Sequence, residues 1–154
     1  MGYHTNFSGA FQLNKPLTVK DFQFLKKINE TRRMKRNVGS EYGVEGEFYV
    51  DGGGFAGQNH ESNIIDFNIP PRTQPGLWCK WTPNEDGTAI EWDGGEKFYN
   101  YVEWIKYIIE KILSPKGYVL NGEVNWYGED RYDEGVICIT DNVVTTKTVK
   151  KTYE

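Results

Sequence analysis

Hydrophobic and polar side chains alternate along the first segment of the chain, residues 2–13. One side of the pattern carries Tyr3, Thr5, Phe7, Phe11 and Leu13, and the other side carries His4, Asn6, Ser8 and Gln12. Successive side chains of a strand point to opposite faces of a sheet. A period of two over this length therefore predicts a half-buried β-strand.

Two later segments have helical spacing instead. The first predicts a helix over about 19–34, with Thr18 as its N-cap and a cluster of basic residues on its last turns, where the helix dipole favours cations. The second predicts a helix that begins after Asp93, with Glu96 as its capping partner, and ends before Pro115. The apolar residues of the two helices are Phe22, Leu25 and Ile28 in the first, and Phe98, Tyr101, Ile105, Ile108 and Ile112 in the second.

The remaining apolar segments are short and read as strands. They cover residues 47–50, 64–68, 77–82, 88–92, 119–127, 136–140 and 143–149. Asp86-Gly87 is a strong hairpin signal between two of them. Runs of strands without strict β-α alternation predict an α+β fold, a mostly antiparallel sheet with two helices packed on one face. We expect a single domain over residues 1–149 and a polar tail at 150–154. Its core should include Phe7, Phe11, Phe22, Leu25, Ile28, Trp81, Ile90, Phe98, Ile105, Ile108, Leu120, Val124 and Ile137.

Composition narrows the class of protein. The 154 residues are one domain's length, and the 15% aromatic content is unusually high. No apolar run approaches the roughly 18 residues of a membrane-spanning helix, and the N-terminus has no secretion signal. Two cysteines, Cys79 and Cys138, are typical of a reducing compartment. We therefore expect a cytoplasmic protein with no membrane partner and predict no particular oligomeric state.

Charge is unevenly distributed. Residues 15–36 contain eight basic and two acidic residues, a net charge of +6 in a chain of net charge −4, so the rest carries −10. One hypothesis is that Arg32, Arg33, Lys35 and Arg36 contact an acidic surface of a host protein or a nucleotide or nucleic-acid phosphate, because arginine suits both anions. The alternative is that these side chains pair within the chain, for instance with the acidic turn 129–134, and serve stability only.

Aromatic residues concentrate between residues 78 and 127. A tryptophan-rich core explains most of them, since buried aromatic residues outnumber exposed ones. The other hypothesis is an exposed aromatic surface, Trp78 with Tyr99 or Tyr127, that stacks a base or contacts a protein partner. The alternation along residues 77–82 places Trp78 on the side opposite Trp81, which supports an outward orientation of Trp78.

Signals for catalysis are weak. The glycine-rich stretch 51–57 lacks the Gly-Lys-Ser/Thr ending of a phosphate loop, and the histidines and cysteines have no metal-site spacing. We therefore expect no metal, no cofactor and no catalytic residue, and a binding protein in which His60 is a further candidate contact. The alternative is a hydrolase or transferase that acts on a nucleotide or glycan through carboxylates and His60. Its candidate carboxylates are Glu91, Asp93 and Glu96.

Several motifs of the chain resemble a family of small bacterial and phage proteins of no established activity. The motifs are PGLWCKW at 75–81, EWDGGEKFYNYVEW at 91–104 and GYVLNGEVNWYGED at 117–130, together with GYHTNFSGAFQLNKPL at 2–17 and ETRRMKR at 30–36. The resemblance implies a small accessory protein encoded by a phage or mobile element. Such a protein would be a host-interaction or anti-defence factor that works by binding a host component. It brings no catalytic residue with it.

Overall fold

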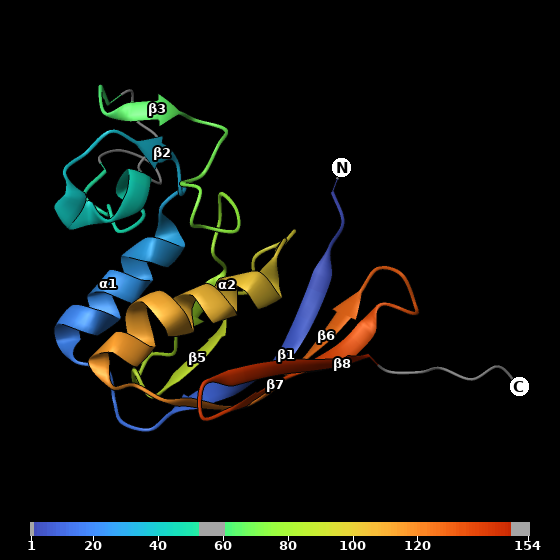
Figure 1. Cartoon of the computed structure of the whole chain (residues 1–154). Helices are drawn as coiled ribbons and strands as arrows, with labels where there is room; N and C mark the ends of the chain where they lie inside the picture. The colour runs from blue at the N-terminus through green and yellow to red at the C-terminus, as the bar shows by residue number, and fades with distance from the viewer. Residues whose placement is uncertain (1, 53–60, 149–154) are drawn as a thin grey trace, which may run out of the picture.

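Six strands form the main sheet in the part of the chain that the structure describes, residues 2–52 and 61–148 (Figure 1). The structure is a computed structural model. The strand order is β4-β5-β1-β6-β7-β8, and every neighbouring pair is antiparallel. The bounds are β1 Thr5–Leu13, β4 Trp81–Pro83, β5 Ala89–Trp92, β6 Leu120–Gly128, β7 Glu134–Thr140 and β8 Val143–Thr148.

Strand β1 lies at the centre of this sheet, between β5 and β6. Its register with β6 runs from Thr5 opposite Gly128 to Leu13 opposite Leu120. Thr5, Phe7 and Phe11 are buried, whereas Asn6, Ser8 and Gln12 are exposed. The strand predicted from the period of two is therefore confirmed, and the side chains on its apolar side pack into the hydrophobic core.

Two helices cover one face of the sheet (Figure 1). They are α1, Val19–Glu30, and α2, Tyr101–Ile108, which continues through a π-helical turn, η4 (Ile109–Leu113), and a 3₁₀ turn, η5 (Ser114–Lys116). The predicted α+β fold is confirmed, and all predicted core residues are buried except Phe22, which is partly exposed. No helix in the described residues is both long and apolar enough to cross a bilayer.

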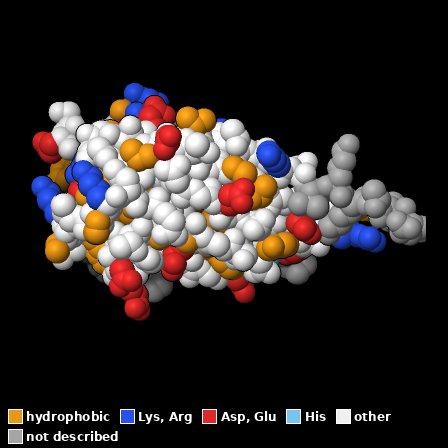
Figure 2. Space-filling model, turned by 90° about the horizontal axis from the view of Figure 1, so that it is seen from below, with side chains coloured by type: hydrophobic (Ala, Val, Ile, Leu, Met, Phe, Trp, Pro, Cys, Tyr) orange, Lys and Arg blue, Asp and Glu red, His pale blue; other side chains and the backbone are white. Residues whose placement is uncertain are grey.

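The opposite face of the sheet is open to solvent. Seen from that side, hydrophobic and acidic side chains are scattered among other groups, and no one kind gathers on it (Figure 2). Asn6, Asn125 and Tyr127 are exposed here, and Tyr127 lies opposite Asn6 in the register of β1 and β6. This alternation of buried and exposed residues is the pattern of an antiparallel sheet covered on one face.

The described residues 32–52 and 61–74 form an irregular region beyond the C-terminal end of α1 (Figure 1). It contains a two-stranded sheet of β2 (Lys35–Arg36) and β3 (Ile64–Asp66) and two 3₁₀ turns, η1 (Ser40–Tyr42) and η2 (Val44–Gly46). Two predictions are wrong here. The first helix ends at Glu30, because Thr31 has an extended backbone, and residues 47–50 form no strand.

The start of α2 also differs from the prediction. Asp93 does not cap the helix, since its carboxylate accepts hydrogen bonds from the Asn29 amide (2.9 Å) and from the backbone N–H of Gly95 (2.7 Å). Lys97 and Asn100 then take left-handed backbone angles, with φ of 59° and 57°. A helix cannot pass through such residues, so it begins only at Tyr101.

Candidate binding site

Two of the four basic residues singled out from the sequence lie inside the protein. Arg33 is 2% exposed and Arg36 is 3% exposed. The Nη2 group of Arg33 donates hydrogen bonds to the carbonyl oxygens of Glu47 (3.0 Å) and Tyr49 (2.8 Å), and burial lowers the pKa of Arg33 to about 10. Neither guanidinium group is on the accessible surface of this structure.

Arg36 forms an ion pair with Glu61 at 3.1 Å, and its guanidinium carbon lies 4.4 Å from the ring centre of Tyr49. Such a stacked and paired arginine contributes to the fold of the chain around it.

The other two basic residues are partly exposed and also contact the irregular region. The Nε of Arg32 donates to the carbonyl oxygen of Phe67 (2.9 Å), and Lys35 pairs with Glu45 (3.2 Å). The acidic turn 129–134 has other partners, since the Tyr3 hydroxyl donates to Asp133 at 2.7 Å. The contacts of the basic cluster thus hold residues 45–49 and 61–68 against the chain that follows α1.

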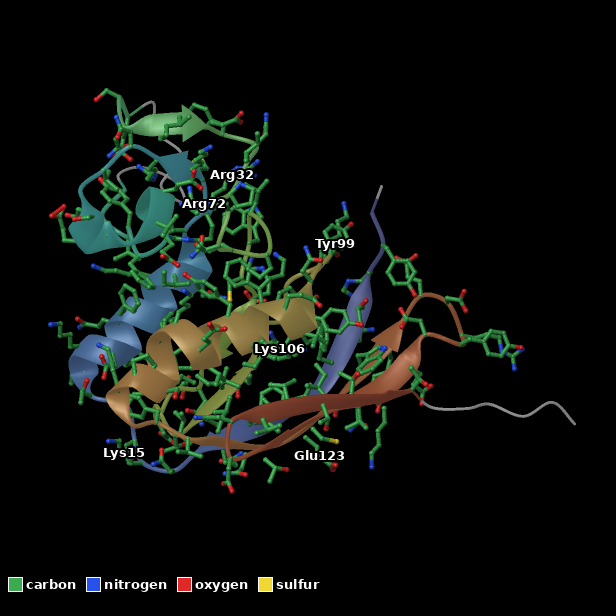
Figure 3. All side chains as sticks on the ribbon, viewed as in Figure 1. Lys15, Arg32, Arg72, Tyr99, Lys106 and Glu123 are labelled. Carbon is green, nitrogen blue, oxygen red and sulfur yellow. The ribbon has the colours of Figure 1, made fainter. Side chains whose placement is uncertain are left out.

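The structure brings two of the three singled-out aromatic residues together. Trp78 and Tyr99 line one cavity of about 390 Å³, whereas Tyr127 lies on the open face of the sheet. Tyr99 is 51% exposed and stands at the edge of the molecule (Figure 3). We call this cavity the aromatic pocket. Its lining consists of Gly76, Leu77, Trp78, Lys80, Glu96, Lys97, Tyr99 and Asn100.

The backbone before α2 determines the shape of the aromatic pocket. The Asn100 side-chain amide donates to the carbonyl oxygen of Pro75 (2.8 Å), which joins the two segments that line the pocket. The backbone N–H of Tyr3 donates to the Tyr99 hydroxyl (3.1 Å). The left-handed angles of Lys97 and Asn100 flank Tyr99 and place its side chain outside the helix. The pocket therefore depends on turns rather than on a regular element.

The electrostatics of the aromatic pocket favour an anion. Lys80 Nζ lies 5.7 Å from the ring centre of Trp78, Lys97 is exposed on the same rim, and Glu96 is the one acidic residue in the lining. Trp78 and Tyr99 both line the pocket, and no ring contact between them occurs among the described residues.

A buried hydrogen-bond donor lies beneath the aromatic pocket. Trp104 is fully buried, and its indole N–H has no hydrogen-bond partner in the described structure. A Cβ on Gly76 would sit 3.6 Å from this nitrogen, and Gly76 lines the pocket. A buried donor without a partner costs about 1–3 kcal/mol.

A second cavity, of about 430 Å³, lies between α1 and the end of the second helix, and sequence reasoning missed it. We call it the lysine groove. Its lining consists of Lys20, Asp21, Gln23, Phe24, Lys27, Phe48, Val50, Lys111, Ile112 and Lys116. The sequence did contain one signal. Lys20, Phe24 and Lys27 recur at i, i+4 and i+7 on one side of α1, away from the stripe predicted to face the core.

The carboxylates of the enzymatic alternative are divided between two cavities. Glu91 and Asp93 line a cavity of about 420 Å³ with Glu85 and Lys26, whereas Glu96 lines the aromatic pocket. His60 lies outside the described residues. Within the described ranges, no group of three or more His, Cys, Asp and Glu residues could hold a metal ion.

Comparison of the chain with protein-family models, with curated proteins and with solved structures found no match. The functional argument therefore depends on the chemistry of the cavities.

Proposed function

We propose that this protein is a non-enzymatic binding protein that holds a nucleotide in the aromatic pocket. The observation that carries the proposal is the presence of Trp78, Tyr99, Lys80 and Lys97 in the lining of one cavity. Indole and phenol rings stack on bases, and lysine side chains bind phosphate. A phage or mobile-element accessory protein of this design would act by sequestering a host nucleotide.

The other groups of the aromatic pocket also suit a nucleotide. Glu96 supplies a carboxylate that can accept a hydrogen bond from the exocyclic amine of a base, and the Asn100 amide offers both a donor and an acceptor. The volume of about 390 Å³ lies in the common range of small-molecule sites, about 300–1,000 Å³. Binding and discrimination need no further group, and no catalytic step is part of the proposal.

The test is isothermal titration calorimetry with ATP, AMP, adenosine and ribose 5-phosphate. We expect the two nucleotides to bind more tightly than the nucleoside or the sugar phosphate, since only they use both rings and lysines. Tyr99→Ala should weaken AMP binding about 5- to 150-fold, because one stacking contact contributes about 1–3 kcal/mol. Lys97→Ala should weaken ATP binding more than adenosine binding.

The matched control is Tyr127→Ala, which removes a tyrosine that is 43% exposed and lies outside the aromatic pocket. This variant should bind all four probes as the unmodified protein does. The proposal fails if no nucleotide binds with a Kd below about 1 mM, which corresponds to roughly −4.1 kcal/mol. It also fails if Tyr127→Ala weakens binding as much as Tyr99→Ala.

A further inference from the structure

The lysine groove combines an apolar floor with three lysines that form no ion pair within the described residues. Lys20, Lys27 and Lys111 are exposed, and none of them forms an ion pair within the described residues. Three unpaired lysines around one cavity are notable in a protein whose net charge is −4. Their charge is available to an anionic partner.

The single acidic residue in the lining is already bound within the protein. Asp21 pairs with Lys116 at 2.8 Å and accepts a hydrogen bond from the Tyr118 hydroxyl at 2.7 Å. Its carboxylate also stands in the first turn of α1, where the helix dipole favours a negative charge. Asp21 therefore does not neutralise the three remaining lysines of the groove.

The floor of the lysine groove is aromatic and aliphatic. Phe24 and Phe48 are half-buried and pack with their ring centres 6.2 Å apart, and Val50 and Ile112 complete the apolar lining. Phe24 comes from α1, Phe48 from the irregular region and Ile112 from η4. An apolar side chain that entered here would lose water contact on several sides, which is favourable at about 25 cal/mol per Å².

The arrangement of the cations indicates the shape of the partner. Lys20 and Lys27 are seven residues apart on α1, about 10 Å along the axis at 1.5 Å per residue. Lys111 belongs to the helical segment on the other wall, where Lys116 is already paired with Asp21. A ligand with one anionic head would use one end of the groove only. Carboxylates on both sides of an apolar stripe match two cationic walls.

We propose that the lysine groove binds an acidic amphipathic helix of a partner protein. The apolar stripe of that helix packs on Phe24 and Phe48, and its flanking carboxylates pair with Lys20, Lys27 and Lys111. The groove shares no lining residue with the aromatic pocket, so this proposal does not depend on nucleotide binding.

The probe is a fluorescein-labelled synthetic helix with leucine at i, i+3, i+4 and i+7 and glutamate on both flanks. Its control is a scrambled peptide of the same composition, and decanoate is a third probe with one anionic head. Fluorescence anisotropy at low and high salt should show that the amphipathic peptide binds more tightly than the scrambled one. Its affinity should fall as salt rises.

The test variant is Lys27→Glu with Lys111→Glu, and the matched control is Lys106→Glu with Lys147→Glu. Both pairs change the net charge equally, and Lys106 and Lys147 are exposed outside the groove. We expect the groove variant to weaken peptide binding about tenfold or more and the control to retain most of it. If the groove variant is unfolded by circular dichroism, Lys20→Gln with Lys27→Gln, which only neutralises charge, replaces it.

Three results would overturn the proposal. The first is equal binding of the amphipathic and scrambled peptides. The second is an equal loss of affinity in the groove and control variants. The third is decanoate binding that Lys27→Glu weakens while the peptide does not bind, which would assign the groove to an amphiphile. Tyr99→Ala must bind the peptide normally, so failure of this proposal is distinguishable from failure of nucleotide binding.

Discussion

The hydroxyl group of Tyr107 donates a hydrogen bond of 2.7 Å to Oε1 of Glu47, 60 residues earlier in the chain. Both side chains are buried, and burial, together with this bond to a carboxylate, raises the pKa of Tyr107. Glu47 also accepts from the Thr73 hydroxyl (2.9 Å) and from the backbone N–H of Val44 (2.8 Å). This carboxylate joins α2 to the irregular region, which supplies Phe48 and Val50 to the floor of the lysine groove.

Tyr107→Phe should therefore lower the free energy of unfolding by about 1–3 kcal/mol, the range for a buried hydrogen bond to a charged group. The substitution leaves the ring in place and removes the hydroxyl, which donates to Glu47 and accepts from the Gln74 side-chain amide at 3.1 Å. Urea denaturation followed by tryptophan fluorescence measures the loss. Tyr127→Phe is the control, because Tyr127 is exposed, and it should change stability by less than about 0.5 kcal/mol. Equal stabilities of the two variants would contradict the role given to Glu47.

The ion pair of Asp21 makes stability depend on pH in the acidic range. Burial alone would raise the pKa of Asp21, but hydrogen bonds from Lys116, Tyr118 and Thr18 outweigh it and hold the pKa below its ordinary value of 3.8. A carboxyl group whose pKa is lower in the folded state stabilises the protein above its unfolded pKa. That contribution is lost as the pH falls through the folded pKa.

Asp21→Asn should accordingly be less stable than the unmodified protein at pH 7, by about 1.5–3 kcal/mol for lost charge-assisted hydrogen bonds. The difference should shrink as the pH falls below about 4, where the carboxyl group of the unmodified protein becomes protonated. Urea midpoints measured between pH 7 and pH 2.5 give both curves. A difference that stays constant across this range would show that Asp21 acts by shape and not by charge.

Arg33 and Arg32 should respond differently to charge reversal. Arg33 is buried with its Nε and Nη1 unpartnered, so Arg33→Glu places a carboxylate against backbone carbonyl oxygens and should cost more than about 3 kcal/mol. Arg32 is partly exposed, and Arg32→Glu should cost only about 1 kcal/mol. Thermal unfolding of the two single variants checks the difference. Equal melting temperatures would show that Arg33 is accessible in solution.

Local patterns predicted the sheet well and the irregular region poorly. The period of two over residues 2–13 and the Asp86-Gly87 turn each depend on neighbouring residues, and both led to the observed strands. The position of Arg33 depends on carbonyl groups 13 to 16 residues later, which no periodicity indicates. The basic cluster therefore looked like a surface patch in the sequence.

In the candidate sites too, residue types could be predicted from the sequence, whereas their arrangement in space could not. The aromatic residues Trp78 and Tyr99 could be singled out by type, but their shared cavity depends on the left-handed angles of Lys97 and Asn100. Lysine and asparagine usually take other conformations, so the sequence predicted a helix there instead. The lysine groove needs Phe48 from the irregular region beside Phe24 of α1, a long-range contact that helical spacing does not contain.

Gly9 should tolerate no side chain. Its φ is +108°, and an added Cβ would lie 2.7 Å from the backbone oxygen of Glu123 on the neighbouring strand β6. Gly94 also has a positive φ, +84°, but nothing lies within 4 Å of its added Cβ. Gly94→Ala should therefore lower the free energy of unfolding only by the cost of the backbone strain, about 1–2 kcal/mol. Gly9→Ala adds a clash with backbone and should lose clearly more in urea denaturation. A smaller loss at Gly9 than at Gly94 would be inconsistent with this close approach of β1 and β6.

The two cysteines should differ in reactivity toward iodoacetamide. Cys79 is fully buried, and burial raises its pKa to about 12, so it should react only after unfolding. Cys138 is half-exposed on the open face of the sheet, and its thiol donates to Oε2 of Glu123 at 3.3 Å. Burial and the Glu123 carboxylate raise the pKa of Cys138, whereas Lys147 lowers it. Cys138 should therefore react in the folded protein, but more slowly than a free thiol.

Substitutions at its two charged neighbours should change this rate in opposite directions. Glu123→Gln removes the charge that opposes the thiolate, so the pKa of Cys138 should fall and alkylation at pH 8 should become several-fold faster. Lys147→Gln removes the positive charge that stabilises the thiolate, so the pKa of Cys138 should rise and its alkylation should slow. Mass spectrometry of the alkylated peptide over time gives both rates. If the two variants changed the rate in the same direction, access to the sulfur rather than the charge of Glu123 and Lys147 would control its reactivity.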